Sequence, residues 1–131
     1  MQILTSQTTH YALTAEQMAP YRAGAMQRAK QKRQQQLARY HQGRSVAEQA
    51  AQHLKTRWGA SKVVLFGSLL TPDNVHSRSD IDLAVWGLPE ADYLSALADL
   101  LDLDPDFSID LVEADYASPN LLRAIQAGID L

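Results

Sequence analysis

The stretch LFGSLLTPDNVHSRSDIDLAV, residues 65–85, sets the architecture of this 131-residue chain. It starts in an apolar segment, turns at Gly67-Ser68, crosses a polar loop and enters a second apolar segment that opens on Asp80 and Asp82. Both apolar segments have the length and composition of buried β-strands. Like charges at the head of a buried strand cost free energy unless they are neutralised. This stretch is therefore also the first candidate for a functional site.

Carboxylates gather on one face of the predicted sheet. Side chains alternate along a strand, so Asp80 and Asp82 share a face, about 7 Å apart. Asp110 lies inside a later apolar segment, and it joins the pair if that strand lies beside the first with matched faces. One interpretation is that these are solvated edge residues. The pattern favours the other interpretation, a Mg²⁺ site, because Mg²⁺ is held by one or two carboxylates together with substrate phosphates.

The Gly-Ser turn supplies the complementary half of such a site. Gly67 lets the backbone approach a phosphate closely, and Ser68 adds a hydroxyl beside its N–H. A single Gly-Ser has no significance by itself. Its position here, after an apolar strand and shortly before Asp80 and Asp82, indicates a phosphate-binding turn. Arg78 in the connecting loop is either a phosphate-neutralising group or a solvated side chain.

The sequence before residue 44 predicts helical structure. Thr14 followed by Gln17 favours a short helix start, and Pro20 favours the first turn of a following helix. Residues 21–41 are rich in helix formers and poor in large apolar residues, so we expect a basic, Gln-rich helix with a thin apolar stripe. Gly43 then predicts a break in the helix.

A second long helix is predicted over residues 46–58. Ser45 and Glu48 have the spacing of a capping box, in which each side chain accepts a hydrogen bond from the other residue's backbone N–H. Gly59 favours a C-terminal stop directly after this helix. The hydrophobic period then changes from helix to strand, which places the start of the sheet shortly after residue 59.

The second half of the chain predicts three strands and two helices. The strands are residues 62–66, 81–87 and 107–114, and the helices are residues 89–103 and 118–128. In the first of these helices Leu94, Leu97 and Leu101 are expected to face inward. Ser118 is expected to cap the last helix, with Pro119 at its first position. This order indicates an α/β protein of the α+β kind with a mixed sheet.

Charge divides the chain into two regions. Residues 1–62 carry ten Lys or Arg and two acidic residues, a net charge of +8, whereas residues 63–131 carry two Arg and thirteen acidic residues, a net charge of −11. We expect different partners for the two regions. The basic segment from Arg22 to Arg44 is interpreted as a solvated helix face, as a surface for RNA or DNA phosphates without sequence specificity, or as a docking surface for an acidic partner.

The composition excludes several classes of site. The chain has no cysteine, which excludes a disulfide framework and a cysteine-based zinc site. Its four histidines, at positions 10, 41, 53 and 76, lack metal-ligand spacing. Its N-terminus lacks the pattern of a targeting segment, and no apolar run has the length of a membrane span. We therefore expect a cytoplasmic protein without a membrane partner.

Together these motifs resemble the polymerase-beta-type nucleotidyltransferase superfamily, and within it the minimal nucleotidyltransferases that pair with HEPN proteins. The signature of that group is a strand ending in Gly-Ser, a loop, Asp-x-Asp, and often a further Asp on a later strand. The matching residues here are Gly67, Ser68, Asp80, Asp82 and Asp110. The resemblance covers residues 59–131, the predicted nucleotidyltransferase core, and leaves residues 1–58 as a basic N-terminal helical extension.

The resemblance implies nucleotidyl transfer from a nucleoside triphosphate, expected to be ATP. It implies two Mg²⁺ ions, one bridging the triphosphate and held by Asp80 and Asp82, the other held by both and by Asp110. Gly67 and Ser68 would hold the β- and γ-phosphates. These implications assign Asp80, Asp82 and Asp110 as catalytic and metal-binding residues.

The resemblance also implies a biological role. Minimal nucleotidyltransferases of this kind are antitoxins that bind a HEPN ribonuclease toxin and adenylylate one of its tyrosines, and a HEPN-type toxin is therefore the expected partner. Two alternatives stay open. One is transfer to a small hydroxyl compound, as in antibiotic-modifying relatives. The other is an antitoxin that neutralises its partner by contact without catalysis.

Overall fold

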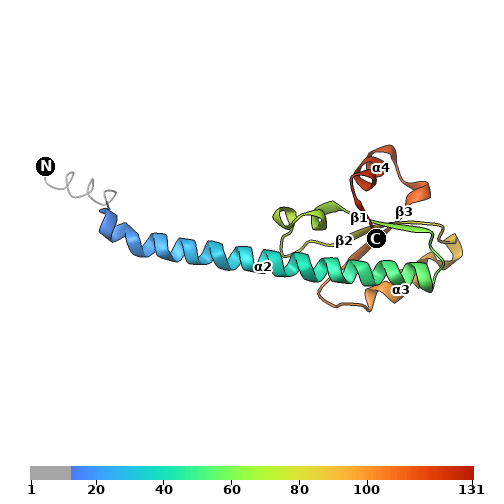
Figure 1. Ribbon diagram of the computed structural model, residues 1–131, viewed down its shortest axis with the longest axis horizontal. Coiled ribbons are helices and arrows are strands. Elements are labelled where there is room, and N and C mark those ends of the chain that lie inside the picture. The colour runs from blue at the N-terminus through green and yellow to red at the C-terminus, as the bar shows by residue number, and fades with distance from the viewer. Residues whose placement is uncertain (1–12) are drawn as a thin grey trace, which may run out of the picture. The chain divides into compact units, whose positions relative to one another are not determined.

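The computed structural model describes residues 13–131, a long helix and a four-stranded sheet with smaller helices (Figure 1). In chain order the elements are α2 (Ala15–Thr56), β1 (Lys62–Phe66), β2 (Ile81–Trp86), α3 (Tyr93–Leu101), β3 (Ile109–Glu113), α4 (Pro119–Gln126) and β4 (Ile129–Asp130). Short 3-10 helices η1 (Gly67–Leu70), η2 (Pro72–Asn74), η3 (Glu90–Asp92) and η4 (Ala114–Tyr116) lie between them. The predicted class, α/β with a mixed sheet, is confirmed. None of the helices within residues 13–131 combines the length and apolarity that crossing a bilayer requires.

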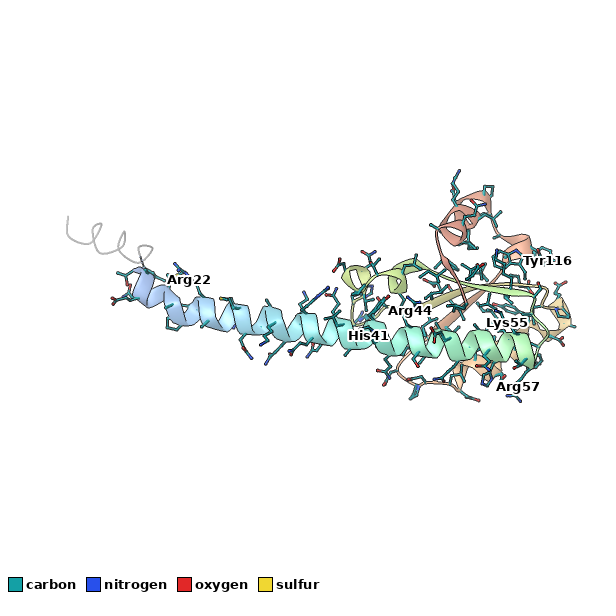
Figure 2. All side chains as sticks on the ribbon, in the orientation of Figure 1. Arg22, His41, Arg44, Lys55, Arg57 and Tyr116 are labelled. Carbon is teal, nitrogen blue, oxygen red and sulfur yellow. The ribbon has the colours of Figure 1, made fainter. Side chains whose placement is uncertain are left out.

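The chain divides into two compact units between Gln35 and Gln36. In the first unit, residues 13–35 include the N-terminal part of α2, and none of them is buried. Its basic side chains, such as Arg22 in Figure 2, project from the helix into solvent. The second unit contains the sheet and the remaining helices. The predicted boundary after residue 58 stays a prediction, and His10 lies outside the described residues.

Helix α2 is a single helix where separate helices were predicted. Its start is the predicted one: Thr14 N donates to Gln17 Oε1 at 2.9 Å, and Gln17 N donates to Thr14 Oγ1 at 3.1 Å. The predicted second start was wrong, since Ser45 and Glu48 lie in the middle of the helix. Pro20 also lies inside the helix, where its missing N–H removes one hydrogen bond without ending the helix.

Gly43 does not break the helix, and its role is close packing. It is buried, and a Cβ atom at this position would lie 2.9 Å from Leu69 Cδ2 and 3.1 Å from Phe107 Cε1. These distances are shorter than normal van der Waals contacts between carbon atoms. The residue is therefore glycine because the helix axis lies unusually near the core at this point.

The sheet has the strand order β3-β2-β1-β4. Strand β1 pairs antiparallel with β2 and with β4, and β2 pairs parallel with β3. Strand β1 has the predicted bounds, and β2 and β3 fall inside the predicted segments. Strand β4 was not predicted, because two residues are too short to show a period.

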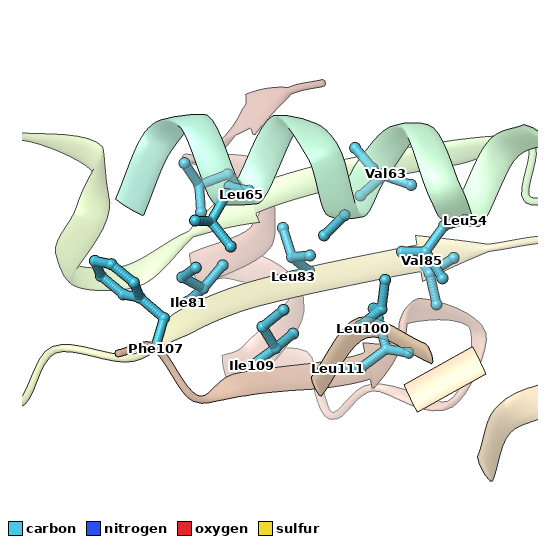
Figure 3. Packing of buried hydrophobic residues seen from close by; sticks show 14 of the residues in the cluster. Leu54, Val63, Leu65, Ile81, Leu83, Val85, Leu100, Phe107, Ile109 and Leu111 are labelled. Atoms are coloured by element: carbon cyan, nitrogen blue, oxygen red, sulfur yellow. The ribbon is translucent and has the colours of Figure 1, made fainter. Parts of the chain in front are cut away.

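Two hydrophobic clusters cover the two faces of the sheet. The larger one packs Leu54 of α2 and Leu100 of α3 against alternate residues of the strands (Figure 3). These strand residues are Val63, Leu65, Ile81, Leu83, Val85, Ile109 and Leu111. The smaller cluster, on the opposite face, packs Ile125 of α4 against Val64, Phe66 and Ala84. The cluster on this second face contains fewer buried residues than the one under α2 and α3.

Helix α3 presents a face to the core that matches the prediction only in part: Leu97 packs against the larger cluster as predicted. Leu94 and Leu101 are 75% and 49% exposed, so their predicted inward orientation was wrong, whereas Ala96 and Leu100 are buried. The orientation is fixed by polar anchors at both ends of the helix. Tyr93 Oη donates to the carbonyl oxygen of Leu111 at 2.7 Å, and the carboxylate of Asp99 bonds to residues near the end of α2.

The Asp99 carboxylate connects α3 to the C-terminal end of α2. It accepts hydrogen bonds from Trp58 Nε1 at 3.1 Å and Arg57 Nη1 at 3.1 Å, and it lies 3.3 Å from His53 Nδ1. The hydrogen bond from Trp58 is the main reason that the pKa of Asp99 is lowered. Its contribution to stability is therefore present above the unfolded-state pKa and is lost as the pH falls through the lower folded-state value. Ser118 caps α4 as predicted, accepting from Leu121 N at 3.3 Å.

The role of Gly43 can be tested with a matched pair of substitutions in α2. Gly43→Val should lower the free energy of unfolding by about 1–3 kcal/mol, because the added carbons overpack the buried Leu69. Gly24→Val should be neutral or slightly stabilising, since the nearest atom outside the helix backbone is the flexible end of Arg28. Urea unfolding followed by circular dichroism measures both. Equal stability of the two variants would contradict this account of Gly43.

Candidate active site

Neighbouring strands bring the predicted residues together at one end of the sheet. Phe66 at the end of β1 is paired with Asp82, and Asp82 is paired with Asp110 across the parallel β2–β3 ladder. Paired residues share a face of the sheet, and Phe66 belongs to the cluster on the α4 face. Both carboxylates therefore lie on that face, next to the apolar cluster. Asp110 was expected to join the pair if its strand lay beside the first with matched faces, and this condition is met.

Gly67 lies directly against Asp82. Its φ of +84° falls in the left-handed region, where side chains are disfavoured, and a Cβ atom at this position would overlap Asp82 Oδ2. The turn after β1 thus brings bare backbone to the carboxylate. The glycine is required twice, for the backbone conformation and for the space beside Asp82.

Asp82 carries an electrostatic cost in the ligand-free protein. Its pKa is raised from 3.8 to about 6, first by burial, then by the negative charge of Asp110, then by that of Asp80. Asp80 and Asp110 are exposed to solvent, whereas Asp82 is only partly exposed. The site is therefore graded: one half-buried carboxylate lies between two exposed ones.

The Gly-Ser turn is fixed by the residue that follows it. Gly67 and Ser68 begin the 3-10 helix η1, and Leu69 is fully buried in the larger cluster. Ser68 itself is partly exposed. Leu69 therefore anchors the turn in the core while the backbone at Gly67 and the hydroxyl of Ser68 remain on its outer side.

The loop between the two motifs is held by Ser79, which the sequence analysis missed. Ser79 is 2% exposed, and its hydroxyl accepts a hydrogen bond from His76 N at 2.9 Å. A serine directly before Asp80 was the available signal. Arg78 is exposed, and its backbone N donates to His76 Nδ1 at 3.2 Å. Within residues 13–131 no ion pair joins its guanidinium to the carboxylates, so its phosphate-binding role stays a prediction.

The donor set fits a divalent cation that arrives with its substrate. No group of three or more acidic or histidine side chains in the described part of the chain forms a metal site by itself. Mg²⁺ rarely uses such a cage: it retains waters and binds through one or two carboxylates plus substrate phosphates. A cation beside Asp82 would also offset the burial and the repulsion that raise the pKa of this residue.

Comparison with known proteins identifies the core. Residues 48–131 match the family described as "Polymerase beta, Nucleotidyltransferase", a match over more than half of the chain. It includes all the residues discussed in this subsection and the buried C-terminal part of α2. No curated protein matched the chain.

The electrostatic cost at Asp82 gives a stability prediction for the metal-free protein. In EDTA at pH 8, Asp82→Asn should melt above the parent, and each kcal/mol of relief should raise Tm by about 4 °C. The raised pKa disfavours the ionised form in the folded state, so the destabilisation develops as the pH rises from about 4 to 6. The advantage of Asp82→Asn should therefore shrink as the pH falls through 6.

The control is Asp115→Asn, which removes an exposed carboxylate in η4. Thermal melts from pH 4 to pH 8 should show no comparable pH-dependent gain for this variant. Asp110→Asn should raise Tm less than Asp82→Asn does. The charge of Asp110 is only the second cause of the raised pKa of Asp82, and burial is the first. A gain at Asp82 that is the same at every pH would rule out the electrostatic cause.

Proposed function

The chain belongs to the polymerase beta nucleotidyltransferase family, and from this premise we propose that it transfers AMP from ATP to a tyrosine hydroxyl of a HEPN-type toxin. In this proposal the protein is the antitoxin of the pair. The single observation that carries the catalytic part is the junction of Gly67, Asp82 and Asp110 at the strand ends. A bare-backbone turn for phosphates lies directly against carboxylates suited to a cation.

Each residue has a distinct task in the proposed reaction. Gly67 and Ser68 bind the β- and γ-phosphates through backbone N–H groups and the hydroxyl. Asp80, Asp82 and Asp110 would hold two Mg²⁺ ions, which when bound stabilise the charge on the attacking and leaving oxygens. Arg78 is proposed to neutralise charge on the triphosphate.

The bond changes follow from the chemistry of the substrates. The tyrosine oxygen attacks the α-phosphorus of ATP, forming a new P–O bond. The bond from the α-phosphorus to the oxygen that leads to the β-phosphorus breaks, and pyrophosphate leaves with that electron pair. The hydroxyl proton passes to the exposed carboxylate of Asp110, which acts as general base.

The exposure of the outer carboxylates supports a macromolecular acceptor. Asp80 and Asp110 are both solvent-exposed, and α4 covers only part of this face of the sheet. A side chain displayed on the surface of another protein can therefore approach the carboxylates. Transfer to a small hydroxyl compound is the alternative within the same chemistry, and neutralisation by binding alone is the alternative without it.

A labelling experiment separates these possibilities. The protein is incubated with ATP labelled at the α-phosphate, with Mg²⁺ or EDTA, and with either a purified HEPN-type protein or a small hydroxyl compound. We expect label on a tyrosine of the HEPN-type protein, only in the presence of Mg²⁺. Label on the small compound alone would favour the first alternative, and binding of the HEPN-type protein without label would favour the second.

Asp82→Asn should reduce transfer by more than about 100-fold, because loss of a direct ligand exceeds the 10- to 100-fold cost of losing an outer-shell partner. The same assay with Asp115→Asn should retain the parent rate. Undiminished transfer by Asp82→Asn at saturating ATP would remove Asp82 from the site.

A further inference from the structure

Helix α2 holds the loop between the two motifs through side chains that bond to its backbone. Gln36 Nε2 donates to the carbonyl oxygens of Asp73 at 3.2 Å and Val75 at 3.0 Å. One turn later, Arg39 Nη2 donates to the carbonyl oxygen of Ser79 at 3.0 Å. The three acceptors are spread along the loop that leads from η1 to Asp80.

Arg39 also reaches the segment that leads to the third carboxylate. The same Nη2 atom lies 3.3 Å from the carbonyl oxygen of Asp106, and the guanidinium lies 4.2 Å from the ring centroid of Phe107. Ile81 N in turn donates to the carbonyl oxygen of Ser108 at 2.9 Å. A single guanidinium thus connects the chain just before Asp80 with the chain just before β3, which carries Asp110.

The chemistry of the side chain suits this task. Guanidinium is planar and permanently charged, bonds to more than one acceptor at a time, and stacks on aromatic faces, which lysine does not reproduce. Arg39 is partly buried, and its buried Nε has no hydrogen-bond partner within residues 13–131. Incomplete satisfaction of a buried charged group is a cost, and such groups call for an explanation. The position of Arg39 between the segments that lead to Asp80 and to β3 supplies that explanation.

We propose that Arg39, with Gln36, is a positioning residue that holds Asp80 and Asp110 in register for the nucleotide-bound cation. The inference rests on the proposed function. It extends the site beyond residues 48–131, the segment that matches the family, into the helix before it. Neither side chain touches the reacting atoms: both act through backbone carbonyls of the loop.

Arg57, in the turn directly after α2, offers a control guanidinium. Arg57 Nη1 also anchors α2, through its 3.1 Å hydrogen bond to Asp99, but this bond connects to α3 and not to the loop. Arg39→Met and Arg57→Met both retain the aliphatic stem and remove one anchoring guanidinium. A merely structural role would make the two variants alike.

The first measurement is amide hydrogen exchange on the ligand-free full chain. Arg39→Met should speed exchange at residues 76–81 by about tenfold or more, because a charge-assisted hydrogen bond that closes the loop is lost. Arg39→Lys should give a smaller increase, since one donor can still reach Ser79. Arg57→Met should leave these amides at the parent rate. If Arg39→Met fails to fold, Gln36→Ala provides the same test at residues 73–76.

The second measurement is the affinity for Mn²⁺ in the presence of a non-hydrolysable ATP analogue. Arg39→Met should weaken it by about 10- to 100-fold, the usual cost of losing an outer-shell partner, while Arg57→Met should stay within about twofold of the parent. Parent-like exchange and parent-like Mn²⁺ affinity in Arg39→Met would overturn the proposal, and so would equal losses in both variants. Absence of Mn²⁺ binding by the parent would overturn the proposed function, while the exchange data would still decide whether Arg39 holds the loop.

Discussion

The close packing of α2 at Gly43 against Leu69 and Phe107 is the contact on which the site geometry depends. Leu69, one of the two side chains that fill this position, follows the Gly67-Ser68 turn, and the other, Phe107, leads into β3. One helix position therefore fixes how close both the proposed phosphate-binding turn and the start of the strand that carries Asp110 lie to α2. The hydrophobic effect stabilises this packing but is non-directional. The hydrogen bonds from Gln36 and Arg39 of α2 to the loop fix the orientation.

The opposite face of the sheet has the reverse character. There the hydrophobic cluster is smaller. Asp82 lies half-buried between the exposed Asp80 and Asp110, and its pKa is raised mainly by burial. Such an arrangement is unfavourable for the isolated chain. It becomes favourable when a cation and phosphates complete the coordination. Binding then relieves part of the repulsion among Asp80, Asp82 and Asp110.

Local rules were sufficient for β1, β2 and β3 and for the face of the sheet on which Asp82 and Asp110 lie. The alternation of side chains predicted that Asp82 and Asp110 share a face if their strands are neighbours, and the parallel pairing of β2 with β3 meets that condition. Long-range contacts decide the remainder. Glycine at position 43 has the same local preference whether it ends a helix or packs closely, and only the contact with Leu69 distinguishes the two. In α3 only Leu97 of the predicted inward leucines packs against the larger cluster, and the hydrogen bond of Tyr93 holds the helix in the orientation that leaves Leu94 exposed.

Strand β3 forms one margin of the sheet: no strand in the described part of the chain pairs with its outer side, although Tyr93 Oη donates to the carbonyl oxygen of Leu111. An open margin of this kind exposes unpaired backbone groups that can recruit a strand from another molecule. Asp110 is charged and exposed near the start of β3, which discourages such recruitment. The carboxylate proposed for catalysis thus also disfavours edge-to-edge pairing of this strand, and a bound cation that neutralised its charge would weaken that protection.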